Sequence, residues 1–171
     1  MKLGPVLSIR QPWVDLIMSG EKPTEIRSQR RKHVGELWIH SSRWEPGIDR
    51  DEWDCGDGLT GCIVGKVVQL GSIRGSALRM WIAGEREHFE QIEIERLEYI
   101  EQSLRQMSPS TDGEPLDPWH YAGLDDDDWN LLLVAPQLLA TPIPCGGQLG
   151  YFHPEIPDGT DLTIINPVAI V

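Results

Sequence analysis

The chain has few of the residues from which disulfide frameworks and metal sites are built. Its 171 residues include only three cysteines, Cys55, Cys62 and Cys145. They are odd in number and widely spaced, and no Cys-x-x-Cys or His-x-x-x-His pattern accompanies them. The sequence therefore predicts no metal ligation and no cofactor, and it favours a reducing, cytoplasmic setting in which the thiols stay unpaired.

Long apolar stretches are also missing. No window of 18 apolar residues exists, and the first residues lack the charged-then-apolar pattern of a secretory signal. We therefore expect a soluble protein with no membrane contact. The length suits one domain, 1–171, that can bury a core without disulfides.

Positive charge is scarce and unevenly placed. The net charge is −12, but residues 1–74 sum to +1 and residues 75–171 sum to −13. An acidic chain repels nucleic acid at long range, so duplex DNA is disfavoured as a partner. Contacts with RNA would have to be local, whereas an uncharged nucleoside would escape the repulsion. The basic residues available for such contacts are Arg10, Lys22, Arg27, Arg30, Arg31, Lys32 and Arg43.

The most informative segment is Gly20-Glu21-Lys22-Pro23-Thr24-Glu25-Ile26-Arg27. It is predicted to form a glycine stop after a short helix, a bend at Lys22, and a strand. Side chains two apart on a strand share a face, so Glu25 and Arg27 would be presented side by side. Such a pair could clamp a ligand that has both donors and acceptors, or it could be an ordinary exposed ion pair of little energetic weight.

Other motifs surround this segment in a fixed order. They are Leu-Ser-Ile-Arg-Gln-Pro-Trp at 7–13, Gly-Glu-Leu-Trp-Ile-His-Ser-Ser at 35–42, Gly-Cys-Ile-Val-Gly-Lys-Val at 61–67 and Pro-Ile-Pro-Cys-Gly-Gly at 142–147. Together they resemble the ASCH domain (activating signal cointegrator homology), a relative of the PUA domains that bind RNA. The resemblance covers roughly residues 5 to 70 and 129 to 153. Pro23 departs from the family pattern, which usually has an unconstrained residue at this position. It removes a backbone donor and biases Lys22 toward an extended conformation.

The resemblance implies an α+β, mainly β fold: a small PUA-like antiparallel β-barrel with flanking helices. An acidic helical insertion at about 72–128 falls outside it. Local patterns place a helix at 12–19, strands at 24–27, 36–39, 62–70, 129–134 and 149–153, and a longer helix at 83–107. Residues 161–171 are β-branched, and such a tail is expected to pair with the sheet or with a second copy of the chain, giving a homodimer.

The first functional hypothesis is a binding module for RNA or a modified nucleoside. Its cleft would be lined by the Lys22–Arg27 segment. His40 and Ser41 end a strand where polar groups could face that cleft, although a capped strand end with an exposed histidine explains them equally well. Arg30 and Arg31 could hold a phosphate or form a solvated loop. The full set of predicted ligand-binding residues is Arg10, Gln11, Lys22, Glu25, Arg27, Arg30, Arg31, His40 and Ser41.

The second hypothesis is hydrolysis in the same cleft. Some ASCH proteins are amidohydrolases on acylated cytidine, or ribonucleases, and the resemblance implies a catalytic lysine at Lys22. The same enzymes carry a threonine where this chain has Glu25, and they use an acidic residue in the later helical segment. Lys22 and Glu25 could act as a base–acid pair. Thr24 points to the opposite face and is a poor substitute for the missing hydroxyl. A protein-interaction scaffold that uses the acidic half is the third alternative.

Overall fold

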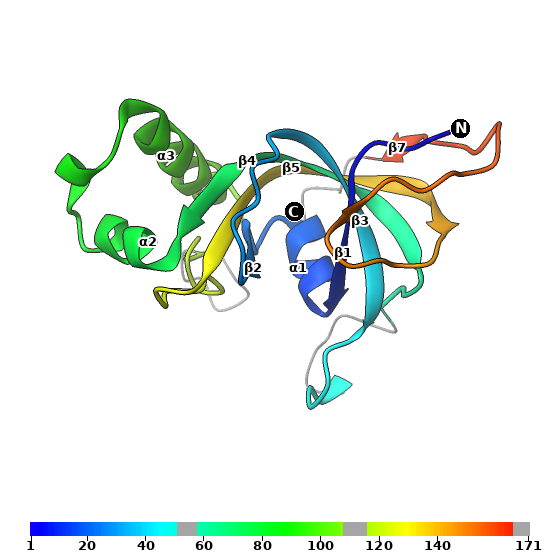
Figure 1. The fold of residues 1–171 in the computed structure, drawn as a ribbon, viewed down its shortest axis with the longest axis horizontal. Coiled ribbons are helices and arrows are strands. Elements are labelled where there is room, and N and C mark those ends of the chain that lie inside the picture. Colours follow the sequence, from blue (N-terminus) through cyan, green and yellow to red (C-terminus); the bar gives the residue numbers. More distant parts are fainter. Residues whose placement is uncertain (51–57, 108–115, 166–171) are drawn as a thin grey trace. The chain divides into compact units, whose positions relative to one another are not determined.

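Figure 1 shows the computed structural model, which describes residues 1–50, 58–107 and 116–165. The chain divides into two compact units that are built from interleaved segments. The described parts of unit 1 are 1–19, 36–50, 58–68 and 135–165, and those of unit 2 are 20–35, 69–107 and 116–134. Two long strands, β4 (Cys62–Arg74) and β5 (Trp129–Pro144), have one part in each unit. The prediction of a single domain remains a prediction.

Unit 1 is a mixed sheet with one short helix. Its other strands are β1 (Val6–Gln11), β3 (Gly35–Trp44), β6 (Tyr151–Phe152) and β7 (Ile164–Ile165). The strand order is β5-β4-β3-β1-β6, with β7 also on β5. β1 runs parallel to β3, with Leu7 opposite Ile39, and antiparallel to β6. The sheet is therefore mixed, and no pairing among the described residues closes it, so the predicted barrel is not observed.

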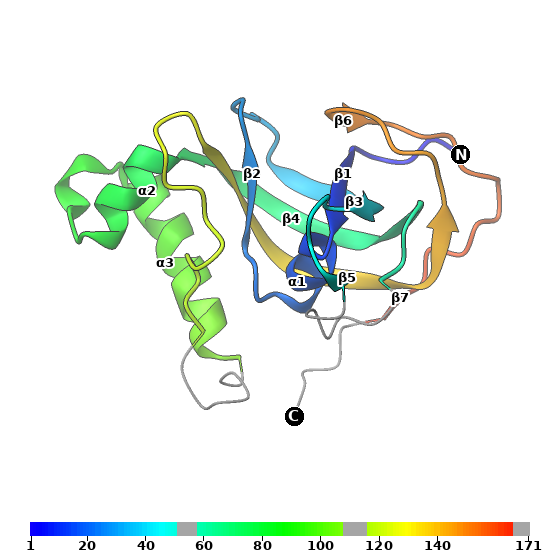
Figure 2. The same cartoon turned by 90° about the horizontal axis from the view of Figure 1, so that it is seen from below.

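Helix α1 (Trp13–Ser19) follows β1 directly and lies against it in Figure 2. The sequence explains its bounds, because Pro12 suits a helix start and Gly20, with a φ of 89°, provides the stop. The helix confirms the prediction for 12–19. Its buried side chains are Val14, Leu16, Ile17 and Met18. The core of the unit is otherwise made by buried apolar residues, most of them on strands: Leu3, Val6, Trp38, Ile63, Leu139, Ile143, Phe152 and Ile156.

Unit 2 combines a short sheet with helices. Strand β2 (Thr24–Arg27) matches its predicted bounds and pairs antiparallel with β5, Glu25 facing Leu131. Helices α2 (Gly75–Ile82) and α3 (Gln91–Arg105) lie side by side in Figures 1 and 2, joined by the short 3₁₀ helix η2 (Arg86–His88). Their shared core contains Ile73, Leu78, Trp81, Leu97, Ile100, Leu104, Trp119 and Leu132.

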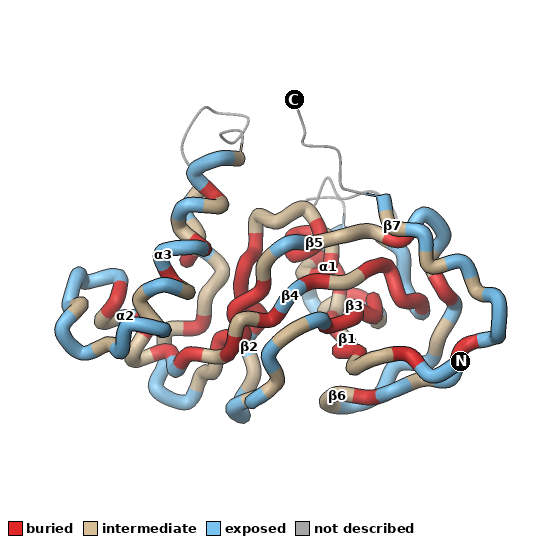
Figure 3. The backbone as a smooth tube through the Cα atoms, turned by 90° about the horizontal axis from the view of Figure 1, so that it is seen from above, coloured by how far each residue is buried: buried red, intermediate tan, exposed pale blue. Residues whose placement is uncertain are grey.

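Helix α3 is amphipathic, and Figure 3 shows buried residues recurring along a helix whose other residues are exposed or intermediate. The acidic residues of such a helix are expected to face solvent, but one of them has a structural role. The Glu101 carboxylate accepts hydrogen bonds from the indole N–H groups of Trp81 at 2.8 Å and Trp119 at 3.2 Å. Because a buried indole N–H needs an acceptor, Glu101 allows two tryptophans to enter the core.

Three predicted elements need correction. The helix expected over 83–107 is shorter: Gly84, with a φ of 87°, and the 3₁₀ helix η2 precede it, and α3 spans only Gln91–Arg105. Strand β5 was expected to stop before Pro136 but continues through it, with Ala135 at a φ of 51°. The predicted strand at 161–171 is limited in the described part to β7, which pairs with β5; residues 166–171 lie outside the described residues.

The mainly β architecture with a few helices is confirmed, and every helix within the described residues is too short or too polar to cross a membrane.

Candidate functional site

The structure brings Lys22, Glu25 and Arg27 together in unit 2. The Glu25 carboxylate lies 3.5 Å from Lys22 Nζ and 3.1 Å from an Arg27 guanidinium nitrogen. Lys22 Nζ also donates to the backbone carbonyl of Thr24. The arrangement follows from the local fold, because Glu25 and Arg27 share a face of β2 and Lys22 precedes the strand at the bend. The result is one carboxylate held between two cations.

These three side chains are far less exposed than the sequence suggested. Only 4% of the Lys22 side chain and 9% of the Glu25 side chain reach solvent, against 27% for Arg27. Burial lowers the pKa of the Lys22 ammonium below its ordinary value of 10.5; Glu25 opposes this shift and Arg27 adds to it. The interpretation as an exposed ion pair of little weight is therefore wrong. Arg27 is the member most accessible to a ligand.

Thr24 occupies the opposite face of β2 from Glu25 and is fully buried. Its hydroxyl forms no hydrogen bond with any described residue. Burying an unsatisfied hydroxyl costs about 1–3 kcal/mol in proteins. We therefore expect Thr24→Val, which keeps the shape and removes the hydroxyl, to raise the free energy of unfolding by about 1 kcal/mol in a urea titration. A loss of stability would show that the hydroxyl has a partner.

Gln11 and Ser41 meet in unit 1 at one backbone carbonyl. The carbonyl of Leu59 accepts from Gln11 Nε2 at 3.2 Å and from the Ser41 hydroxyl. Gln11 Nε2 also donates to the Asp15 carboxylate at 2.8 Å. Burial raises the pKa of Asp15, and the hydrogen bond with Gln11 opposes the rise. Both predicted ligand-binding side chains are thus buried and anchor the segment that holds Leu59.

His40 lies inside unit 1, only 2% exposed, so the alternative of an exposed histidine is wrong. Its Nε2 is 2.9 Å from the carbonyl of Cys145, and its Nδ1 is 3.1 Å from the Ser8 hydroxyl. Because a carbonyl only accepts, Nε2 carries the proton and Nδ1 accepts. A Cβ on Gly147 would come within 2.6 Å of the ring, so the imidazole is tightly enclosed. Burial lowers the pKa of His40, and the Cys145 carbonyl opposes this.

Arg10, the remaining predicted residue of unit 1, pairs with Glu45 at 2.5 Å and has a side chain 41% exposed. This is a partly exposed ion pair at the end of β1.

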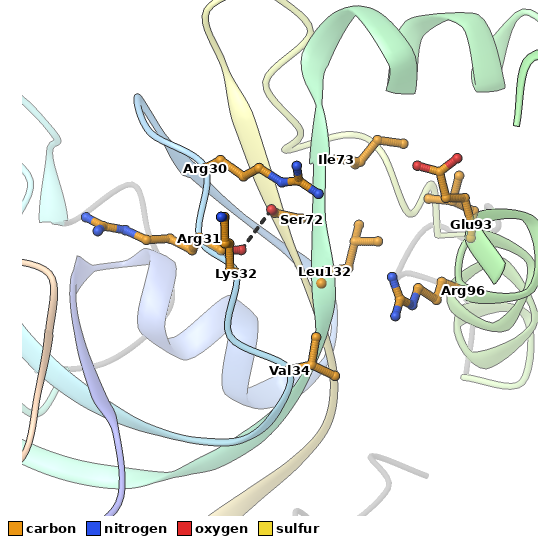
Figure 4. A pocket seen from close by; sticks show the side chains of 11 residues that line it. Arg30, Arg31, Lys32, Val34, Ser72, Ile73, Glu93, Arg96 and Leu132 are labelled. Atoms are coloured by element: carbon orange, nitrogen blue, oxygen red, sulfur yellow. Dashed lines mark hydrogen bonds between the residues drawn. The ribbon is translucent and has the colours of Figure 1, made fainter. Parts of the chain in front are cut away.

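The basic loop after β2 lines a cavity of about 300 Å³ in unit 2 (Figure 4). The guanidinium of Arg30 also lies 5.4 Å from the centre of the Trp129 ring, as does that of Arg74. Lys22, Glu25 and Arg27 are absent from the lining. The residues that line it are Arg30, Arg31, Lys32, Val34, Gly71, Ser72, Ile73, Glu93, Arg96, Leu97 and Leu132.

Sequence reasoning missed the α3 side of this cavity. Arg96 and Glu93 belong to a helix whose outer face is acidic, and that pattern indicates solvent exposure. The sequence signal that could have found it is the rarity of basic residues in this part of the chain, because Arg96 is one of only four after residue 74.

Among the described residues no three His, Cys, Asp or Glu side chains gather in a way that could hold a metal ion. Cys62 and Cys145 are free thiols whose pKa burial raises, and Cys55 lies outside the described residues. In the run of four aspartates at 125–128, Asp126 pairs with Arg79 at 3.1 Å, and the Asp128 carboxylate accepts from the backbone N–H of Asp125. This run is a turn capped by its own side chains.

Comparison with known proteins places the chain in a family. The family model of the ASCH domain matches residues 7–109, more than half of the sequence, and the chain belongs to the ASCH domain family. No curated protein matches. Among solved structures, the chain is similar to an ASCH protein from Zymomonas mobilis, with 15% identity and a TM-score of 0.40 over 81% of this chain and 71% of that chain.

Two mutants of the same Zymomonas protein are also similar. A Tyr-to-Phe mutant shows 18% identity and a TM-score of 0.40, and covers 81% of this chain and 73% of that one. A Ser-to-Ala mutant shows 19% identity and a TM-score of 0.37, with coverage of 81% and 72%.

Proposed function

We propose that this ASCH protein binds RNA or a modified nucleoside through the Lys22–Glu25–Arg27 cluster. The observation that carries the proposal is one buried carboxylate within 3.5 Å of two cationic side chains. A nucleobase presents amino donors beside ring and carbonyl acceptors. Glu25 can accept from the amino group, and Arg27 can donate to a carbonyl or phosphate oxygen.

The low exposure of the cluster favours a small ligand. Water competes poorly for hydrogen bonds at buried groups, so each charged hydrogen bond to a ligand is stronger there. The net charge of −12 works against broad duplex binding. A single nucleoside or a splayed-out base of single-stranded RNA meets both conditions.

Hydrolysis is the second candidate, and one observation favours it. The lowered pKa of the Lys22 amine moves it toward the range in which an amine acts as a base. An acylated cytidine would then lose its acyl group: water adds to the acyl carbon, the C–N bond breaks, and the products are a carboxylic acid and the free amine. We rank binding above hydrolysis, because the chain carries Glu25 where the amidohydrolases of this family carry a threonine.

The test compares Lys22→Met and Arg27→Gln with the wild type in titrations of cytidine, an acylated cytidine and a short single-stranded RNA. We expect each substitution to weaken binding by about 1.5–3 kcal/mol, the range for hydrogen bonds to charged groups. Lys66→Met is the matched control, since Lys66 forms an ion pair with Glu36 in unit 1. Equal affinities in all four proteins would refute the proposal.

Product analysis of the acylated cytidine separates the two functions. Release of the acyl group by the wild type, lost in Lys22→Met and kept in Lys66→Met, would reverse our ranking. Binding with no release would support a reader.

A further inference from the structure

The cavity beside the basic loop has a charge balance opposite to that of the chain. Four of its eleven described lining residues are basic, and Glu93 is the only carboxylate among these eleven. The whole chain has 15 basic and 27 acidic residues, so a chance sample of its surface would be acidic. This pocket is therefore a local region of positive potential on a protein that otherwise repels anions.

Two guanidinium groups approach the cavity from different elements. In Figure 4 the side chains of Arg30, from the loop, and Arg96, from α3, extend toward the space between these elements, whereas the Arg31 guanidinium extends away from α3. Gly71 makes room for Arg96. It is buried, has a φ of 145°, and a Cβ there would lie 3.1 Å from a guanidinium nitrogen of Arg96. A side chain at this position would require the Arg96 guanidinium to shift slightly.

The loop is held in place by a specific hydrogen bond. The Ser72 hydroxyl, on β4, donates to the backbone carbonyl of Arg31 at 2.9 Å (Figure 4). Glu93 is likewise fixed, because its carboxylate accepts from the backbone N–H of Glu90 at 3.1 Å at the start of α3. The cationic groups are thus carried on anchored backbone, which lowers the entropy cost of binding an anion between them.

The remaining lining is apolar: Val34, Ile73, Leu97 and Leu132. The volume of about 300 Å³ lies at the lower end of the roughly 300–1,000 Å³ range of small-molecule sites. A charged rim with an apolar wall suits a ligand that joins an anionic group to a flat organic body. Guanidinium groups match phosphate oxygens in geometry as well as charge.

We infer that this pocket binds the phosphate group of a nucleotide, with Arg30 and Arg96 as its donors and Lys32 adding positive charge. The inference deepens the proposed function, on which it rests for the identification of the ligand as a nucleoside derivative. It adds that the preferred ligand is phosphorylated. The phosphate can belong to a free nucleotide or to an RNA strand, and in both cases the recognised chemistry is the same.

The experiment titrates the full chain with cytidine 5′-monophosphate, cytidine and inorganic phosphate at low salt. We expect the monophosphate to bind about tenfold or more tightly than cytidine, as charge-assisted hydrogen bonds predict. Arg96→Gln should abolish this preference, and Arg30→Gln, at an exposed position, should reduce it. Arg105→Gln is the matched control, because it removes the same charge from the same helix outside the cavity.

The variant Glu93→Gln is expected to bind the monophosphate more tightly, a result that a loss of folding could not produce. The variant removes the only carboxylate among the described lining residues, while glutamine can keep the hydrogen bond at the helix start. We expect the monophosphate to bind about threefold or more tightly to Glu93→Gln than to the wild type. Equal affinity of wild type for the monophosphate and cytidine, or equal weakening by Arg96→Gln and Arg105→Gln, would overturn the inference.

Two RNA pentamers, with and without a 5′-phosphate, identify the source of the phosphate. Preference for the phosphorylated pentamer assigns the pocket to a terminal phosphate, and equal binding that Arg96→Gln weakens assigns it to an internal one.

The proposed function and the phosphate pocket can be refuted separately. A phosphate preference that depends on Arg96, with cytidine binding unaffected by Lys22→Met, refutes only the proposed function. Cytidine binding that depends on Lys22, with no phosphate preference, refutes only the pocket.

Discussion

Glu25→Ala is expected to lower the free energy of unfolding by about 3–5 kcal/mol, the cost of removing one partner from a buried ion pair. The carboxylate is within 3.5 Å of Lys22 Nζ and 3.1 Å of Arg27, and the Lys22 side chain is only 4% exposed. Without Glu25 the Lys22 ammonium would remain buried beside a second cation. Chemical denaturation followed by tryptophan fluorescence measures the change.

The matched control is Glu36→Ala. Glu36 also pairs with a lysine, Lys66, at 2.6 Å, but its side chain is 52% exposed, so the expected loss is about 0–1 kcal/mol. The double variant Glu25→Leu with Lys22→Met should recover most of the stability lost in Glu25→Ala, because it removes both buried charges. Equal small losses in Glu25→Ala and Glu36→Ala would contradict the burial of the cluster.

The same cluster shows what a local pattern can predict and what it cannot. Period-two alternation on a strand placed Glu25 and Arg27 on one face, and the glycine stop placed Lys22 at the bend; both features are local. Burial depends on which other segments cover the strand. Glu25 lies opposite Leu131, more than 100 residues later in the chain, and no local pattern contains that pairing. The polarity of Lys22 and Glu25 therefore predicts that they are exposed, whereas in the folded chain both side chains are buried.

The missed elements have similar causes. Helix α2 is only eight residues long and starts at Gly75, directly after a strand, so its pattern is too short to stand out. A proline at position 136 favours the end of a strand, but β5 continues through it beside Ala135, whose φ is positive. The cavity beside the basic loop could be predicted only in part, because its two sides differ in how clearly the sequence marks them. Its loop is recognisable as a basic run, whereas Arg96 is one of only two basic residues among the many acidic residues of α3.

Acid is expected to destabilise the protein through His40. Burial lowers the pKa of this imidazole below 6.5, so its contribution to stability is complete above pH 6.5 and is lost as the pH falls. Below that pH the imidazole is protonated in the unfolded chain but stays neutral in the folded chain. The free energy of unfolding then falls by about 1.4 kcal/mol per pH unit until the folded-state pKa is reached.

Burial of the ring is the main cause of the lowered pKa, and the hydrogen bonds show which nitrogen would take up the second proton. Nε2–H already donates to the Cys145 carbonyl, and Nδ1 accepts from the Ser8 hydroxyl, so a second proton would end the acceptor role of Nδ1. Urea titrations from about pH 7.5 to about pH 5 should show the loss in wild type and a smaller loss in His40→Gln. His153→Gln, which alters an exposed histidine of the same unit and leaves His40 intact, should retain it. Parallel curves for wild type and His40→Gln would show that the buried imidazole accepts its proton without cost.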